Sequence, residues 1–138
     1  QTRNPEHPAL QFALRHDFDG FAAHELAERQ ALGYPPFGRM VGVEFKGPEE
    51  RSVQQLAERW TAGLAAEAQQ VAGVEVLGPT AAFVGRVKRQ WRYHTILKAP
   101  RTLPPPVLTA LVRAAADRAG APPKGHRVNV DVDPLGLF

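Results

Sequence analysis

The stretch RMVGVEFKGPEERSVQQLAERWTAGLAAEAQQV, residues 39–71, describes a strand followed by a helix. Apolar side chains alternate with other side chains over residues 39–46, which is the pattern of a strand with one buried face. Gly47 follows at the point where such a strand would end. The apolar face of the expected strand consists of Val41, Val43 and Phe45.

The second part of this stretch predicts an amphipathic helix. Pro48 suits the first turn of a helix, and Glu49 and Glu50 suit its positive N-terminal dipole. Apolar residues then recur at intervals of three and four, which indicates a helix to about Val71 with one face in a core. The expected core positions are Val53, Leu56, Ala57, Trp60, Leu64, Ala68 and Val71.

Three more strands and one more helix are expected downstream, from alternating apolar residues and from turn-forming Gly and Pro. In chain order these are a strand over residues 74–87 broken at Gly78-Pro79, a hairpin tip at 88–90, a strand over 91–99, a helix over 106–120 and a strand over 127–133.

The order β-α-β-β-α-β from residue 39 onward predicts an α+β fold. Four strands and two helices in this order form a split βαββαβ sandwich, ferredoxin-like or ribosomal-protein-like, with both helices on one face of the sheet. We assign residues 39–138 to this domain and residues 1–38 to an N-terminal helical extension. In the extension, one helix is expected to begin at Pro8, and a second to be capped by Asp17 or Asp19 and to end at Gly33.

Composition restricts what this segment does by itself. Its 138 residues suit one domain, and the lack of cysteine excludes disulfides and thiolate zinc sites. No apolar run reaches the roughly 18 residues of a membrane helix. Ser52 is the only serine, and His24 with Glu28 fits an exposed polar pair better than a metal site. We therefore expect no catalytic residue, metal or cofactor here. Because the chain begins at Gln1, we also expect a segment of a longer protein.

The positive charge of the chain is concentrated between Phe83 and Arg101. The whole chain has 17 Lys and Arg against 14 Asp and Glu, a net charge of +3. Without the six cations of this segment, 11 basic residues would face 14 acids, a net charge of −3. Trp91 and Tyr93 lie within the segment, and cations interleaved with aromatic rings predict a nucleic-acid surface. The six cations are Arg86, Lys88, Arg89, Arg92, Lys98 and Arg101.

Strand periodicity predicts which way these side chains point. If both arms of the hairpin are strands, one face is cationic and the other is apolar and aromatic. On the last strand, Asp131 and Asp133 are expected to pair with Arg127 or with the hairpin cations. The expected cationic face holds Arg86 and Lys88 from one arm and Arg92, His94 and Lys98 from the other, with Lys88 and Arg89 at the tip.

A purely structural interpretation of the same hairpin stays open. In it, the cations are a solvated sheet face, and Trp91 and Tyr93 are core residues. Against it, like charges on one sheet face repel one another, and no acid within the segment offsets them. If about four of the cations contacted phosphates of duplex DNA, log K against log salt would have a slope near −3.6.

Four stretches together resemble the C-terminal region of the primosomal replication-restart helicases, the PriA or primosomal protein N′ family. The most specific parts are GYPPF and DVDP in the expected order and spacing, and the resemblance covers almost the whole chain. The stretches are QTRNPEHPAL at 1–10, ELAERQALGYPPFGRM at 25–40, VLGPTAAFVGRVKRQWRYHTILKAP at 76–100 and RVNVDVDPLGL at 127–137.

The resemblance implies a domain similar in fold to a small-subunit ribosomal protein, joined through residues 1–38 to the end of the second helicase lobe. It implies binding of branched or single-stranded DNA at stalled forks in the bacterial cytoplasm, near the nucleoid. The parent would be an ATP-dependent 3′–5′ DNA helicase of replication restart and primosome assembly. Its ATP, Mg and Zn sites would lie outside this chain, which would not be an enzyme by itself. The matching DNA-binding residues are Arg86, Lys88, Arg89, Trp91, Arg92 and Tyr93.

The resemblance leaves a second function open, that of a protein-interaction module. In the family this domain contributes to docking the acidic C-terminal tail of the single-stranded DNA-binding protein, near the start of the second helix. Here that region is TLPPPVL, residues 102–108, and Arg101 and Lys98 are the candidate partner-binding residues. A third possibility is that residues 1–38 dock on the helicase lobes and that the domain mainly positions them.

Overall fold

The structure, a computed structural model, describes residues 2–134 as an α+β fold. Within this range it has four helices and one four-stranded antiparallel sheet. The helices are α1 (Pro8–Leu14), α2 (Phe18–Ala31), α3 (Glu50–Ala68) and α4 (Pro105–Ala119). The strands are β1 (Gly38–Gly47), β2 (Glu75–Val87), β3 (Gln90–Pro100) and β4 (Arg127–Val132).

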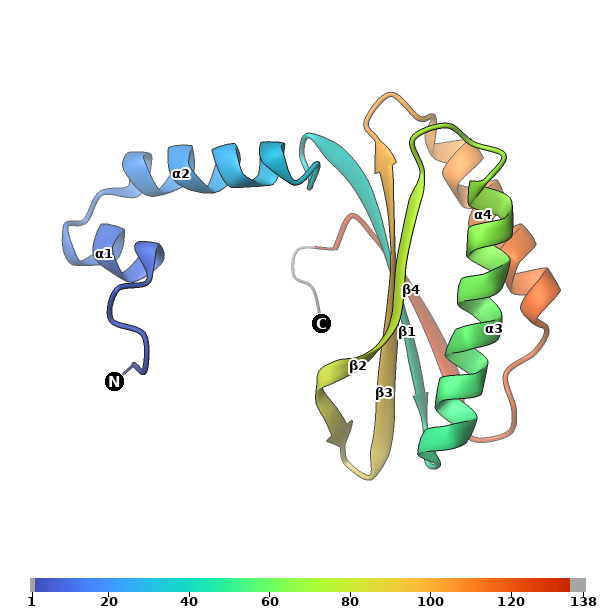
Figure 1. Ribbon diagram of the computed structural model, residues 1–138. Helices are drawn as coiled ribbons and strands as arrows, with labels where there is room; N and C mark the ends of the chain where they lie inside the picture. The colour runs from blue at the N-terminus through green and yellow to red at the C-terminus, as the bar shows by residue number, and fades with distance from the viewer. Residues whose placement is uncertain (1, 135–138) are drawn as a thin grey trace.

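The strands lie in the order β2-β3-β1-β4, so β1 is central and pairs with both β3 and β4. The register places Phe45 of β1 opposite Tyr93 of β3 and Val128 of β4. Residues that lie directly opposite share a face of the sheet, and that face alternates along each strand. Helices α3 and α4 cover the face of Phe45, and neither of them covers the other face (Figure 1).

The core lies between this face and the two helices. Phe45 is fully buried, and its ring meets the ring of Trp60 edge-on with centroids 6.0 Å apart. Inside the core, the hydroxyls of Thr61 and Thr95 form a hydrogen bond with each other, with their Oγ1 atoms 2.6 Å apart. At Gly63 a Cβ atom would lie 3.2 Å from the carbonyl oxygen of Ala115, so glycine allows α3 to approach α4 closely.

The expected order of elements is confirmed, with small differences at the boundaries. A register shift between Leu77 and Thr80 confirms the break in the first arm of the hairpin. Helix α3 ends at Ala68, before Val71, because the amide of Val71 already bonds the Ala68 carbonyl in a turn. Gln90 pairs with Val87 and belongs to β3, which shortens the tip. The ferredoxin-like or ribosomal-protein-like label stays a prediction.

Helices α1 and α2 form a pair that extends from the start of β1, away from α3 and α4 (Figure 1). Asp17 caps α2, because its Oδ1 accepts a hydrogen bond from the Gly20 amide at 2.8 Å. The two helices contact each other through Phe12 and Phe21, whose ring centroids are 6.2 Å apart. On the outside of this pair, Leu14 and Phe18 are each 76% exposed.

Two phenylalanines of opposite burial test the position of the core. We expect Phe45→Ala to lower the free energy of unfolding by about 3–5 kcal/mol, because it leaves a cavity beneath Trp60. Phe83→Ala is the matched control, since Phe83 is 99% exposed, and its effect should stay within about 0.5 kcal/mol. Urea unfolding of both variants measures the difference, and equal destabilisation would contradict this core.

Candidate nucleic-acid interface

The tip of the β2–β3 hairpin consists of only Lys88 and Arg89. The register pairs Val87 with Gln90, so two residues connect the strands. Both have positive φ angles, 48° at Lys88 and 65° at Arg89. A two-residue loop with both φ angles positive is a type I′ turn, for which Asn-Gly is the preferred sequence. Lys88 and Arg89 therefore adopt a backbone conformation that Asn and Gly would adopt with less conformational strain.

Arg86 lies beside the tip on the same face as Trp91, and this corrects the expected cationic face. The register sets Arg86 directly opposite Trp91, and its guanidinium carbon lies 5.3 Å from the centroid of the indole. Arg92 therefore points to the opposite face from Arg86. The predicted tip of three residues would have placed even-numbered residues of both strands on one face. The actual tip has two residues, and the pairing shifts after Ala81, so that even-numbered Arg86 of β2 lies opposite odd-numbered Trp91 of β3.

Carboxylates from other strands neutralise much of the sheet face that the helices leave open. Arg92 Nη2 lies 2.6 Å from Oε1 of Glu44, and Lys46 Nζ lies 2.8 Å from Oε2 of the same side chain. Asn129 of β4 also donates to Glu44, at 3.3 Å. Lys98 lies 3.6 Å from Glu75. The segment itself has no acid, but acids from β1 and β2 offset Arg92 and Lys98.

Glu44 is the buried centre of this network, with 8% of its surface exposed. Burial by itself would raise the pKa of Glu44, but hydrogen bonds from Lys46, Arg92 and Asn129 outweigh it and hold the pKa below its ordinary value. Beside it, burial and then the charge of Arg92 lower the pKa of His94. The centre of the open face therefore holds a carboxylate that stays charged and an imidazole that stays neutral near pH 7.

The two candidate partner-binding residues both have contacts within the chain. Besides Glu75, Lys98 lies over the ring of Tyr34, with Nζ 5.5 Å from the centroid. Arg101 donates a hydrogen bond to the carbonyl oxygen of Pro36. Both residues therefore attach the sheet to the YPPF segment, residues 34–37.

The aromatic residues of the hairpin pack toward the core. Trp91 and Tyr93 are partly buried and lie against the cluster around Phe45. Burial and the neighbouring carboxylate of Glu50 raise the pKa of Tyr93, which agrees with a position under the start of α3. This geometry favours the interpretation of the two rings as core residues. Their stacking on bases stays a prediction.

Of the six cations of the segment, Arg101 bonds to the Pro36 carbonyl, and the other three without a carboxylate partner in the described residues lie at the end of the hairpin. Among residues 2–134, no acid forms an ion pair with Arg86, Lys88 or Arg89, and all three are exposed.

The expected ion pairs of Asp133 are also corrected. Its Oδ1 accepts the Met40 amide at 2.9 Å and its Oδ2 lies 3.5 Å from Arg39, because β4 ends beside the start of β1.

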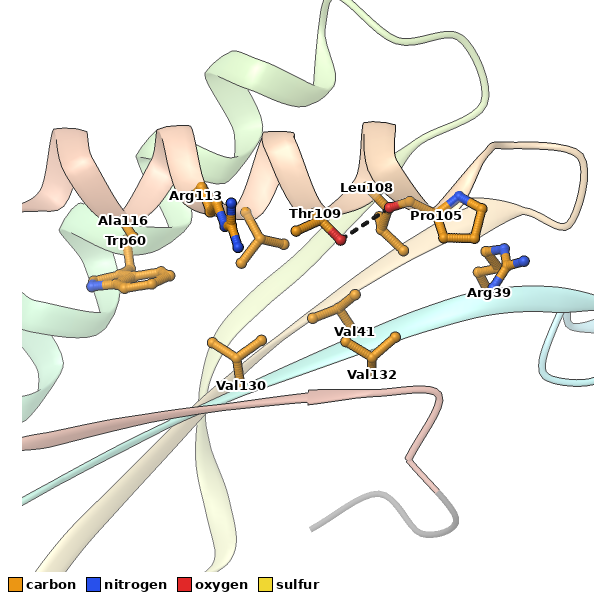
Figure 2. Close-up of a pocket in the computed structure, with 11 residues that line it drawn as sticks. Arg39, Val41, Trp60, Pro105, Leu108, Thr109, Arg113, Ala116, Val130 and Val132 are labelled. Atoms are coloured by element: carbon orange, nitrogen blue, oxygen red, sulfur yellow. Dashed lines mark hydrogen bonds between the residues drawn. The ribbon is translucent and has the colours of Figure 1, made fainter.

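A pocket that the sequence did not indicate lies between α4 and the β1–β4 side of the sheet (Figure 2). Its volume is about 340 Å³. Most of the lining residues are apolar. Trp60 and Ala116 lie toward one end of the pocket, and Arg39 and Pro105 lie toward the other. No periodicity within one element reveals it, because its walls come from α3, α4 and two strands. The remaining lining residues are Val41, Leu108, Thr109, Val112, Arg113, Val130 and Val132.

The described part of the chain has neither a cluster of metal-ligating side chains nor a helix suited to crossing a membrane. Over residues 2–134, no three His, Cys, Asp or Glu side chains come together as ligands for a metal ion. None of the helices in this range combines the length and the apolar character that crossing a membrane requires.

The fold and the site define an α+β domain in which two helices cover one face of an antiparallel sheet and one hairpin ends in exposed cations. The chain belongs to the family described as Primosomal protein N C-terminal domain, which matches residues 30–135. The expected resemblance to PriA is thus confirmed at the level of the family.

Curated relatives support this assignment over the whole chain. The replication restart protein PriA of Treponema pallidum is 38% identical over 138 residues, which is 100% of this chain. That of a Synechocystis species is 31% identical over 139 residues, covering 99% of the chain, and that of Thermotoga maritima is 38% identical over 102 residues, covering 71%. The chain spans only 20%, 16% and 12% of the length of these three relatives.

The buried carboxylate gives a prediction on pH and stability. Glu44 has a lowered pKa, so its stabilising effect is present above the pKa of the unfolded chain and is lost as the pH falls through the folded-state pKa. We expect Glu44→Gln to cost about 1.5–3 kcal/mol at pH 7, and much less at pH 3. Urea unfolding at the two pH values measures this difference.

Glu58→Gln is the control for this experiment, because Glu58 is exposed on α3 and accepts a hydrogen bond from Gln54 of the same helix. Its effect should stay within about 0.5 kcal/mol at both pH values. A cost of Glu44→Gln that is the same at pH 7 and pH 3 would show that the charge of Glu44 does not stabilise the sheet.

Proposed function

We propose that this domain binds branched or single-stranded DNA for a replication-restart helicase, and that the tip of the β2–β3 hairpin makes the phosphate contacts. The observation that carries the proposal is the set of exposed cations Arg86, Lys88 and Arg89, which no carboxylate offsets in the described structure. Phosphate contacts of this kind provide affinity without sequence preference. The parent's ATPase and helicase activity, and the cytoplasmic location, belong to the same proposal.

The backbone of the tip supports this role. Lys88 and Arg89 have positive φ angles that residues with a side chain seldom adopt. Backbone strain at two exposed cations is consistent with a requirement for their charge rather than for the turn itself. The hairpin also projects from the end of the sheet opposite to the junction with α2, where an extended ligand has access (Figure 1).

Arg92 has a different role in this proposal. Its guanidinium is held by Glu44, so a phosphate would have to compete with a carboxylate that is already in place. A charge reversal at Arg92 would also put two carboxylates together on the sheet and would test stability instead of binding. Substitutions of the tip residues therefore test DNA binding without disturbing the ion pairs of Glu44.

Replacing the tip by Asn-Gly separates binding from folding. We expect Lys88→Asn with Arg89→Gly to raise the free energy of unfolding by about 1 kcal/mol, because the new residues suit a type I′ turn. The same variant should bind fork DNA more weakly, and the slope of log K against log salt should become less steep by about 1.4 for contacts to a single strand or about 1.8 for contacts to duplex, since two phosphate contacts are lost. Binding titrations at several salt concentrations and urea unfolding measure the two effects.

A control variant changes the net charge equally at another place. Arg51→Gln with Arg59→Gln removes two exposed cations from α3 and should leave the salt slope unchanged. If the tip variant and this control weaken DNA binding to the same degree, only the net charge matters, and the assignment of the tip is wrong.

A second candidate function is docking of the acidic tail of the single-stranded DNA-binding protein, and we propose that the pocket beside α4 would be its site. The apolar lining suits an apolar terminal residue of a peptide, and the exposed Arg113 suits a neighbouring carboxylate, whereas Arg39 already pairs with Asp133. Arg101 and Lys98 are less suited, because both already have partners in the chain.

Filling the pocket tests this second function. We expect Val130→Phe to weaken binding of an acidic peptide with a C-terminal apolar residue at least about tenfold, because the new ring occupies the pocket. Val107→Phe is the matched control, since Val107 is a similarly exposed valine on α4 that does not line the pocket. Fluorescence titration measures both. Equal binding by the two variants, or competition between the peptide and fork DNA, would exclude this site.

We also propose that residues 1–38 pack against the helicase lobes of the parent. The exposed apolar side chains of α1 and α2, among them Leu14 and Phe18, support this, because such surfaces usually have a partner. Hydrogen exchange of the backbone amides of α1 and α2 should be slower in the parent protein than in this chain. Equal exchange rates would contradict the contact.

A further inference from the structure

Phe83, on the β2 arm of the hairpin, is 99% exposed. No side chain of the described structure covers its ring, whereas Phe45 is fully buried. A phenylalanine in this state contributes little to the core, since burial of an aromatic ring is what stabilises a fold. Phe83 therefore has a ring available for a ligand and no evident role in the fold.

The backbone around Phe83 explains why the ring points away from the protein. The pairing between β2 and β3 shifts between Ala81 and Arg86, so the residues between them leave the regular ladder. Ala82 is buried, while Phe83 and Val84 are exposed. Irregularities of this kind redirect a side chain away from the face it would otherwise occupy.

The surroundings of Phe83 are cationic. Arg86 follows after three residues, which is at most about 10 Å along an extended chain, and the tip residues Lys88 and Arg89 come next. No Asp or Glu occurs in the sequence between Val76 and Ala116. An exposed ring that precedes three uncompensated cations by three to six positions suits a ligand that has both planar bases and phosphates.

We propose that Phe83 stacks on an unpaired base of a strand whose phosphates contact the hairpin tip, so that the hairpin favours strands with exposed bases over duplex. This proposal rests on the proposed function and adds to it the ligand class that this hairpin selects. In a duplex the bases are already stacked on one another, so the ring of Phe83 gains a contact only where a base is unpaired.

The experiment compares Phe83→Ala, Phe83→Trp and Phe83→Leu with the unchanged chain. The ligands are a short oligothymidylate, the same strand with every base removed, and a duplex of equal length. We expect Phe83→Ala to bind the oligothymidylate about 5- to 100-fold more weakly, and Phe83→Trp to retain the affinity. Phe83→Leu should resemble Phe83→Ala, because it is apolar but has no flat ring. On the abasic strand and the duplex, all four proteins should bind alike.

The salt dependence separates this proposal from the one on which it rests. Phe83 has no charge, so Phe83→Ala should weaken binding with an unchanged slope of log K against log salt, whereas the Asn-Gly tip variant changes the slope. If the tip variant behaves as expected and Phe83→Ala binds the oligothymidylate normally, stacking is overturned and the phosphate contacts stand. If the tip variant leaves the slope unchanged, the proposed function itself has failed.

Two further outcomes would also overturn the stacking. An equal loss on the intact and the abasic strand would show that Phe83 affects the hairpin backbone and not a base. Full affinity of Phe83→Leu together with loss in Phe83→Ala would indicate a general apolar contact, as made by a protein partner or by a wedge between paired bases. Urea unfolding of each variant checks that the fold is retained.

Discussion

The buried carboxylate of Glu44 joins the three strands on one side of the sheet and decides the charge of its open face. It accepts hydrogen bonds from Arg92 on β3 and Asn129 on β4 and forms an ion pair with Lys46 on its own strand. A buried charge is tolerated only when it is paired and hydrogen-bonded. Arg92 and Lys46 therefore pair with Glu44, and Lys98 pairs with Glu75. The hairpin-end cations that remain available to a ligand are Arg86, Lys88 and Arg89.

This arrangement separates the surfaces of the domain. The face under α3 and α4 is the core, the centre of the open face is occupied by its own ion pairs, and three exposed cations without a carboxylate partner lie at the end of the β2–β3 hairpin. The pocket lined by Arg39 and Arg113 lies on the β1–β4 side of the sheet. Because β2 and β4 are the two edges, the proposed DNA and peptide surfaces lie apart, and one ligand would not need to displace the other.

The fold was largely readable from local patterns. Alternation in residues 39–46 and the three-and-four spacing that follows gave β1 and α3, because these periods record which side chains face a core. Pro and Gly marked the breaks, and Asp17 marked the start of α2, because their backbone or capping chemistry acts on neighbouring residues. The ends of two elements, at Ala68 and Gln90, depend on turn hydrogen bonds and strand pairing, which the local pattern does not record.

The candidate site was only partly predictable. The sequence alone determined that positive charge collects between Phe83 and Arg101 and that Lys88 and Arg89 lie at a turn, because charge and turn geometry are properties of neighbouring residues. Only the tertiary structure decided that Glu44, 48 positions from Arg92, neutralises the charge of Arg92, and that Arg86 faces Trp91. Strand pairing brings together residues that are far apart in the chain, and a two-residue tip fixes which faces coincide. The exposure of Phe83 and the pocket beside α4 likewise depend on contacts between elements, which no local pattern records.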